Sequence, residues 1–290
     1  MKPILRYGGI NSQTDFFGWR KVNSTIEIKD NVIKIPKDMN KTNVKEIAKY
    51  NVIGLMDSIT IGCDIEAELV RLGEVVEANM HLKLNSNMNS EFGFDGSPRI
   101  VELRPGIAKT PEELFDKIHL LWIKYIKTFD STNKTFTYSG KKFSTGMHLH
   151  AGHPLGLPVP VKIMTKALHR YLGHIASLGN SLVRSRTSYG DTIFANFHSA
   201  IETKPYGFEY RTPSAWLAQD KRAFCIAYNI FTNVIKAVFS GRLIDCDYTT
   251  PARLSEYKNI NISIDDVQYL TRHCKRINRA KISCRPECYI

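Results

Sequence analysis

Acids, histidines and arginines recur two residues apart in five short segments of the chain. In order, these segments are Asp64-Ile65-Glu66-Ala67-Glu68, Glu102-Leu103-Arg104, His148-Leu149-His150, Arg184-Ser185-Arg186 and Glu209-Tyr210-Arg211. Because successive side chains of a β-strand point to opposite faces, residues two apart share one face of a sheet. Carboxylates and histidines on such a face can hold divalent cations, and arginines can neutralise phosphate oxygens. The pattern therefore predicts a metal–nucleotide site on a sheet.

The first segment places three carboxylates on one strand face. Asp64, Glu66 and Glu68 repel one another there unless a cation lies between them. The alternative is a solvent-facing strand on which the charges keep a sheet edge soluble. Gly62, which precedes the acids on the same strand face, and an unbroken apolar pattern on the opposite face favour the cation site.

Histidines dominate the third segment. His148, His150 and His153 lie within six residues and are flanked by Gly146 and Gly152, which allow close backbone approach. A single strand histidine is usually structural, but this cluster favours contact with a ligand. The histidines do not form a His-Glu-x-x-His signature, so a metalloprotease site is not expected.

Arginines accompany the acids in the remaining segments. A surface salt bridge is the alternative reading of Glu102 and Arg104, although Pro105 ends their strand at a point where sites often form. Arg184 and Arg186 lie in a segment with little apolar content, as suits a loop that clamps polyphosphate. Neither a Gly-x-x-x-x-Gly-Lys-Ser/Thr loop nor a Gly-x-Gly-x-x-Gly turn is present, so a nucleotide must be held without those cradles.

The elements that position these side chains are predicted from periodicity. Strict alternation predicts a strand over 58–72, a turn at 72–74 opens a hairpin, and further strands are expected at 99–104 and within 135–150. A capping box at Thr110-Pro111 begins a helix, Pro158 and Pro160 open a second, and others are expected near 219–239 and 265–279. We expect an α+β fold in which helices cover one side of a curved, largely antiparallel sheet.

Composition places the chain among ordinary globular proteins. Of 290 residues, 43% are hydrophobic and 23% are charged. The N-terminus lacks the apolar core of a signal peptide and no apolar run approaches the roughly 20 residues that cross a bilayer, so we expect a soluble, cytoplasmic protein. His273, Cys274, Cys284 and Cys288 lack the paired close spacings of zinc sites, so free thiols are the favoured reading.

Basic residues concentrate in the second half of the chain. The net charge is +12, and residues 146–290 contain 19 basic and 10 acidic side chains. One hypothesis is a binding protein without catalytic activity that grips nucleic acid or an acidic partner. A solvated helix face together with arginines committed to phosphate is the favoured interpretation.

The order of the motifs resembles the phage-type COOH–NH2 (carboxylate–amine) ligases of type 2, within the glutamine synthetase and glutamate–cysteine ligase superfamily. The resemblance spans roughly residues 58–240. It rests on an acid-x-acid strand, a Glu-x-Arg strand, a His-x-His strand, paired arginines and a final Glu-x-Arg strand, and the last continues as Thr212-Pro213-Ser214-Ala215-Trp216. Each motif alone is weak, but five in the same order are specific.

This resemblance implies a glutamine synthetase-like catalytic fold that binds ATP with two or three Mg²⁺ or Mn²⁺ ions. It implies that the protein joins a carboxylate to an amine through an acyl phosphate, in the host cytoplasm if the chain is virus-encoded. The implied metal ligands are Asp64, Glu66, Glu102, His148 or His150, and Glu209. The implied nucleotide-binding residues are His148, His150, Arg184, Arg186 and Arg211, and the implied catalytic residues are Arg104, Arg184, Arg186 and Arg211.

Two departures and one alternative activity accompany this hypothesis. Asp64 stands where many relatives have Glu, and Glu68 is an additional acid without an assigned role. A phosphotransferase acting on a guanidinium or amine is the alternative within the same fold. We divide the chain into an N-terminal subdomain or edge elements (1–50), a catalytic ligase core (51–254) and a basic helical extension packed on the core (255–290). Small-molecule or peptide substrates are expected, and an oligomer remains possible.

Overall fold

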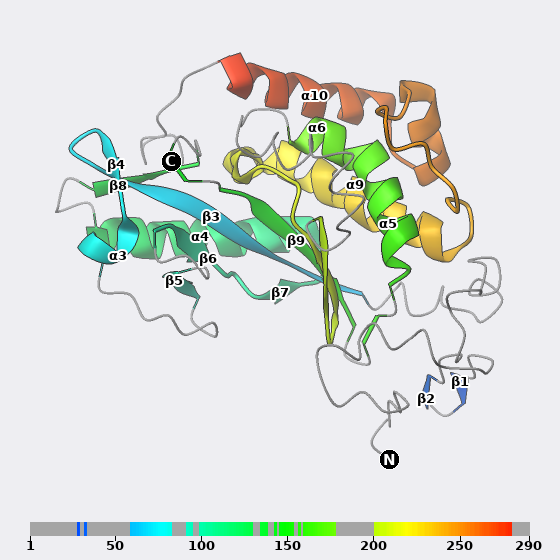
Figure 1. The fold of residues 1–290 in the computed structure, drawn as a ribbon, viewed down its shortest axis with the longest axis horizontal. Coiled ribbons are helices and arrows are strands. Elements are labelled where there is room, and N and C mark those ends of the chain that lie inside the picture. The colour runs from blue at the N-terminus through cyan, green and yellow to red at the C-terminus, as the bar shows by residue number, and fades with distance from the viewer. Residues whose placement is uncertain are drawn as a thin grey trace.

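The computed structural model describes residues 28–29, 32–33, 59–82, 91–94, 99–129, 134–138, 142–143, 145–153, 156–157, 159–177 and 200–279. Two short strands, β1 (Ile28–Lys29) and β2 (Val32–Ile33), pair with each other. The remaining strands form one large sheet, and the longest helices lie against it (Figure 1).

The strand β3 (Thr60–Arg71) runs through the centre of the large sheet. The sheet has the order β10 (Ile201–Lys204), β11 (Gly207–Tyr210), β9 (Met147–Gly152), β3, β6 (Val101–Leu103) and β5 (Phe92–Phe94). Three further strands pair with β3, namely β4 (Glu74–Val76), β7 (Ile107–Ala108) and β8 (Lys134–Thr137). Every pairing within the described ranges is antiparallel, which confirms the expected sheet type.

The four helices predicted from the sequence are present, and the structure adds short helices at 78–81, 215–219 and 254–260, which are not among those four. In chain order, the helices of the described residues are α3 (Ala78–His81), α4 (Pro111–Phe129), α5 (Val161–Leu168), a π-helical turn η3 (His169–Gly173), α6 (His174–Ala176), the 3₁₀ turns η4 (Ala215–Gln219) and η5 (Leu254–Ile260), α9 (Lys221–Phe239) and α10 (Ile264–Arg279). Half of the expected capping box of α4 forms, because the backbone N–H of Glu113 donates to Thr110 Oγ1. The return bond is shifted by one residue: Glu113 Oε2 accepts from the N–H of Lys109, the residue before Thr110.

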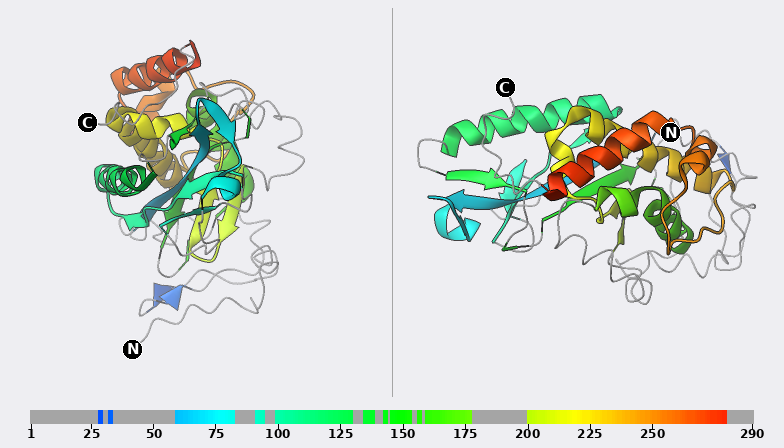
Figure 2. Two further views of the ribbon diagram at one scale, coloured as in Figure 1. Left: turned by 90° about the vertical axis from the view of Figure 1, so that its left-hand side faces the viewer. Right: turned by 90° about the horizontal axis from the view of Figure 1, so that it is seen from above.

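One face of the sheet is covered by helices α4 and α9, and α10 packs on α9 (Figures 1 and 2). The central helix α9 buries Phe224, Tyr228 and Phe231 completely. The hydroxyl of Tyr228 donates a hydrogen bond to the carbonyl oxygen of Gly62, which ties α9 to the first part of β3. The alternating apolar side chains of β3, from Ile61 to Leu69, supply the sheet side of this core. The helix layer therefore fixes the strand that carries the first acidic segment.

The last described helix joins the same core. In α10, Val267, Leu270 and Cys274 are buried, and the helix contacts α9 and α6. The three-part division of the chain stays a prediction, because most of residues 1–50 and all of 280–290 lie outside the described residues. Among the helices described, none is both long enough and apolar enough to cross a membrane.

Candidate metal and nucleotide site

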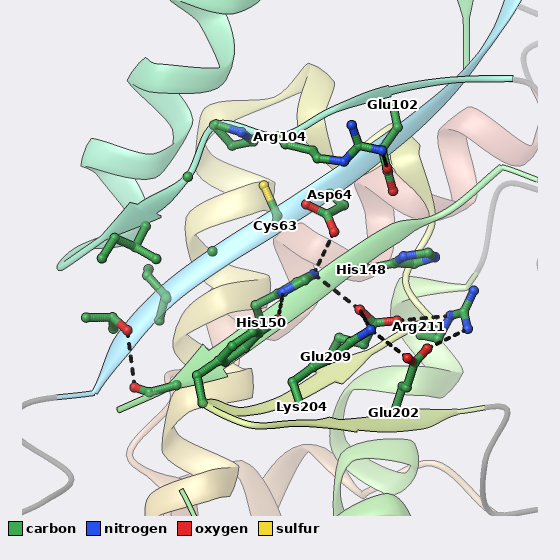
Figure 3. A pocket seen from close by; sticks show the side chains of 18 of the residues that line it. Cys63, Asp64, Glu102, Arg104, His148, His150, Glu202, Lys204, Glu209 and Arg211 are labelled. Carbon is green, nitrogen blue, oxygen red and sulfur yellow. Dashed lines mark hydrogen bonds and ion pairs between the residues drawn. The ribbon is translucent and has the colours of Figure 1, made fainter. Parts of the chain in front are cut away.

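Strand register brings together residues that are far apart in the sequence. Asp64 on β3 lies directly opposite His148 on β9, and His150 on β9 lies opposite Gly62 on one side and Glu209 of β11 on the other. Their side chains project from the sheet face opposite α9, toward one another (Figure 3). Three of the five segments with a spacing of two thus converge at the centre of the sheet.

Gly62 is needed where the strands converge. A Cβ atom built at this position would lie 3.3 Å from the carbonyl oxygen of Gly106 and 3.6 Å from the Cβ of His150. The first distance is tighter than ordinary van der Waals contact, so a larger residue would press on the backbone after β6. Glycine here leaves room for the imidazole of His150 above β3.

A cavity of about 960 Å³ opens over these side chains. Its size is at the upper end of the range of roughly 300–1,000 Å³ that is common for ligand pockets. Its lining contains five carboxylates and only three lysine or arginine side chains: Asp64, Glu91, Glu102, Glu202 and Glu209 against Arg104, Lys204 and Arg211. An excess of two negative charges, in a chain whose net charge is +12, favours a bound cation.

Two groups of side chains have the spacing of a metal site. In the first, one ligand atom from each of Asp64, Glu102 and His148 lies within 4.8 Å of the others, and in the second the same holds for Asp64, His150 and Glu209. Asp64 belongs to both groups, so the two positions are adjacent. Carboxylate oxygen with imidazole nitrogen is a ligand set used for Mg²⁺ or Mn²⁺ when carboxylates predominate.

The second group contains an atom that a metal would satisfy. His150 Nε2 is buried and lies 3.1 Å from Asp64 Oδ2 and 3.7 Å from Glu209 Oε2, with which it forms ion pairs only when the imidazole is protonated. In the neutral ring this atom makes no hydrogen bond. A buried polar atom that lacks a hydrogen bond is costly unless a ligand completes it. These residues therefore fit the cation that the sequence motifs imply.

Tyr206 fixes the orientation of this imidazole. Its hydroxyl lies 2.7 Å from His150 Nδ1, and the two rings are nearly parallel. When Nδ1–H donates this hydrogen bond to the hydroxyl oxygen, Nε2 carries the lone pair and directs it toward the carboxylates, as metal ligation requires. Tyr206 lies in the turn between β10 and β11, outside every motif with a spacing of two, so the sequence analysis missed it.

Four alternating charges line one end of the cavity, on the hairpin β10–β11. Glu202 and Glu209 are directly opposite in the register, which would be unfavourable for two carboxylates alone. Lys204 Nζ bridges them at 2.6 Å from Glu202 Oε1 and 3.3 Å from Glu209 Oε2. Arg211 bridges the other oxygens at 3.1 and 3.3 Å. We call these four residues the hairpin charge ring (Figure 3).

The pKa values within the hairpin charge ring reflect this pairing. Burial alone lowers the pKa of Lys204, but the carboxylates of Glu202 and Glu209 outweigh burial and raise it. Burial raises the pKa of Glu202, yet the lysine and the arginine reverse the effect and the net pKa is lowered. Burial dominates at Glu209, whose pKa is raised although His150, Lys204 and Arg211 oppose the change. Neither Glu202 nor Lys204 was among the residues proposed from the sequence.

Glu102 and Arg104 form the opposite end of the cavity. Their side chains make an ion pair, and Arg104 Nη2 also donates to the carbonyl oxygen of Phe94 at 2.8 Å. Both are nearly buried. The guanidinium is therefore held beside the first metal group, within reach of a ligand in the cavity.

Glu66 and Glu68 lie on the same strand as Asp64 but outside the cavity lining. Glu66 Oε2 accepts the backbone N–H of Gly146 at 2.6 Å, while its other oxygen is 3.8 Å from His148 Nε2. Glu68 Oε1 accepts the N–H groups of Lys142 and Phe143. Both acids thus hold the segment that precedes β9. The assignment of Glu66 as a metal ligand stays a prediction.

The remaining residues of the sequence motifs differ in what the structure shows of them. Arg184 and Arg186 lie outside the described residues, so their expected contact with phosphate stays a prediction. His153 lines the cavity, and burial lowers its pKa. Cys63 is buried beside Tyr228, and burial raises the pKa of its thiol well above the usual value, which makes it a poor nucleophile.

Comparison with known families gives a match over more than half of the chain. The profile of the phage phiEco32-like COOH.NH2 ligase family, type 2, aligns with residues 61–238. This range includes every candidate residue of the cavity described above. A comparison with curated proteins gave no significant match.

Solved structures that match this protein in a structural comparison have low sequence identity to it. A bifunctional glutathione synthetase from Pasteurella multocida has 11% identity and a TM-score of 0.39, with 80% of this chain and 48% of that chain covered. A glutamine synthetase from Plasmodium falciparum has 12% identity and a TM-score of 0.38, with 74% and 60% covered. GmaS without ligand has 10% identity and a TM-score of 0.38, with 88% and 76% covered. The chain thus spans about half the length of the first of these proteins.

Proposed function

The chain belongs to the phage phiEco32-like COOH.NH2 ligase family, type 2, as the order of its motifs indicates, and from this premise we propose that it is an ATP-dependent carboxylate–amine ligase. The observation that carries the proposal is the pair of adjacent metal groups that share Asp64 on the floor of a large cavity. Arginines at both ends of that cavity suit a substrate with several anionic groups.

The proposed reaction has two steps. A carboxylate oxygen of the first substrate attacks the γ-phosphorus of ATP, the bond to the β–γ bridging oxygen breaks, and an acyl phosphate and ADP result. The amine of the second substrate then attacks the acyl carbon, loses a proton, and expels inorganic phosphate as the amide forms. Such a site works by positioning and charge neutralisation more than by covalent chemistry.

Each group of residues has a separate task in this proposal. Asp64, Glu102 and His148 would hold one divalent cation, and Asp64, His150 and Glu209 a second. Bound Mg²⁺ or Mn²⁺ would neutralise phosphate charge and orient the γ-phosphate. Arg104 and Arg211, at opposite ends of the cavity, would stabilise the charge that develops on the transferring phosphoryl group. Small-molecule or peptide carboxylates and amines are the proposed substrates.

The test is transfer of an isotope label in addition to turnover. Panels of carboxylates and amines are screened for release of ADP and phosphate that requires both substrates and Mg²⁺. With ¹⁸O in the carboxylate, one labelled oxygen should appear in the phosphate, because the acyl phosphate passes that oxygen to its leaving group. Failure of every pair to give turnover, together with no binding of MgATP in calorimetry, would refute the proposal.

Two variants separate loss of the site from loss of the fold. Glu209→Gln should abolish turnover and weaken Mn²⁺ binding, while the melting temperature changes little. Glu74→Gln, in the exposed part of β4, is the matched control and should behave as wild type. A stable phosphorylated product without an amide would instead identify a phosphotransferase. Salt-dependent nucleic-acid binding that survives Glu209→Gln, without turnover, would favour the binding-protein hypothesis.

A further inference from the structure

One oxygen of the hairpin charge ring faces two competing partners. Glu209 Oε2 lies 3.3 Å from the ammonium nitrogen of Lys204 and 3.7 Å from His150 Nε2. His150 and Glu209 belong to the same metal group as Asp64. A metal cation bound by those three side chains would replace the ammonium of Lys204 as the positive charge beside Glu209 Oε2.

The other partner of Lys204 keeps it near the site. Its nitrogen lies closer to Glu202 Oε1, at 2.6 Å, than to Glu209. Glu202 is also held by Arg211, and none of the candidate metal groups in the described ranges includes it. When Lys204 moves away from Glu209, Glu202 can therefore retain it within the lining of the cavity.

We propose that Lys204 is an internal counter-ion that occupies the Glu209 side of the metal position, is displaced when the metal binds, and then contacts the anionic part of the nucleotide. The proposal rests on the ligase function argued above and assigns it a further binding residue. Metal and nucleotide binding would be coupled through this one side chain, because the metal releases the ammonium that the phosphates need.

Charge balance supports the displacement. Lys204 and Arg211 together neutralise Glu202 and Glu209, so the ring has no net charge. A divalent ion added beside Glu209 brings positive charge close to an ammonium, and the repulsion is strong because the lysine is only 27% exposed. The cavity beside the ring is the direction in which the ammonium can move.

The test compares Lys204→Met with wild type in two binding experiments on the whole protein. For Mn²⁺ alone, calorimetry should show binding that is roughly tenfold tighter in the variant, the size expected from removing one partly buried ion pair. For AMPPNP at saturating Mn²⁺, the variant should bind roughly tenfold more weakly, because a charge-assisted contact to phosphate is lost. Partial unfolding would weaken both, so the opposite signs identify the proposed role.

Three further variants act as controls. Lys204→Arg keeps the charge and should bind Mn²⁺ like wild type, and Lys204→Gln replaces Lys204→Met in both experiments if the latter does not fold. Lys166→Met removes a lysine of similar exposure that pairs with Asp245 and does not line the cavity, so neither affinity should change. Mn²⁺ binding to Lys204→Met that equals or falls below the wild-type affinity overturns this proposal alone. Absence of Mn²⁺ binding by the wild type overturns the proposed metal site as well.

Discussion

Replacing Glu68 by leucine is expected to destabilise the fold and to leave metal binding intact. Glu68 follows Asp64 and Glu66 at the same spacing, yet its side chain is fully buried and does not line the cavity. Its Oε1 atom accepts the N–H groups of Lys142 and Phe143, both at 2.6 Å. These bonds fasten residues 142–143 to β3, a short distance before β9 begins.

The size of the effect follows from these two hydrogen bonds. A hydrogen bond to a charged group contributes about 1.5–3 kcal/mol, and removing the carboxylate also removes its desolvation cost. The second effect offsets part of the first, so the free energy of unfolding should fall by about 3 kcal/mol in Glu68→Leu. In Glu68→Gln the amide oxygen can still accept both N–H groups without the charge, and about half of that loss is expected.

Urea unfolding and Mn²⁺ calorimetry on the same preparations measure the two properties separately. Glu68→Leu should lower the unfolding midpoint. Its Mn²⁺ affinity should stay within about twofold of the wild-type affinity, which is a small difference in binding free energy. Asp64→Asn should show the reverse, with stability retained and Mn²⁺ binding strongly weakened. If Glu68→Leu loses Mn²⁺ binding but not stability, the division of labour on β3 is wrong.

Three more outcomes follow from single contacts. Tyr206→Phe removes the hydroxyl beside His150 Nδ1 and should not lower the melting temperature. It should weaken Mn²⁺ binding roughly tenfold in calorimetry, the loss that is usual when a hydrogen-bond partner of a metal ligand is removed. An unchanged affinity would contradict the positioning role of Tyr206. Gly207→Ala places a Cβ against the carbonyl oxygen of Ala151 and should cost about 2–4 kcal/mol in urea unfolding, since β9 and β11 must separate; a neutral result would show that the strands can shift. Burial, followed by a neighbouring imidazole, lowers the pKa of His169 to about 4, below its ordinary value of 6.5. The unfolded state therefore takes up the proton first, and stability is lost as pH falls from about 6.5 toward 4, by about 3 kcal/mol in total. Urea unfolding of His169→Phe should lack that part of the pH dependence, and equal slopes would refute the assignment.

Much of the sheet was predictable because alternation over β3 is long and strict. The side chains from Ile61 to Leu69 meet the helix layer as expected, and Asp64 lies on the other face. The same reasoning could not separate Asp64 from Glu66 and Glu68. Which acid reaches the cavity depends on the residues that lie beside the strand at each point. Those that bind Glu66 and Glu68, namely Lys142, Phe143 and Gly146, are 74 to 80 residues away along the chain.

The residues that were missed share a different physical cause. Lys204 is the last residue of β10, and Tyr206 lies in the turn before Gly207. Neither residue type at such a position forms a sequence motif that predicts catalysis. Their importance arises from the register that sets Glu202 against Glu209 and from the turn that folds Tyr206 over β9. A pattern within one strand predicts the strand, but a charge balance between two strands requires their pairing to be known.

The charge balance between β10 and β11 also offsets repulsion among the carboxylates of the site. Glu202 and Glu209 face each other in the sheet, and Asp64 lies within metal-binding distance of the second. Like charges so placed are stable only with cations between them, and Lys204 and Arg211 supply those cations on one side only. On the other side, His150 Nε2 faces the carboxylates of Asp64 and Glu209, and it supplies positive charge to them only when the imidazole is protonated. A divalent ion among these three side chains would supply that charge with a neutral imidazole, so this is where it would contribute most.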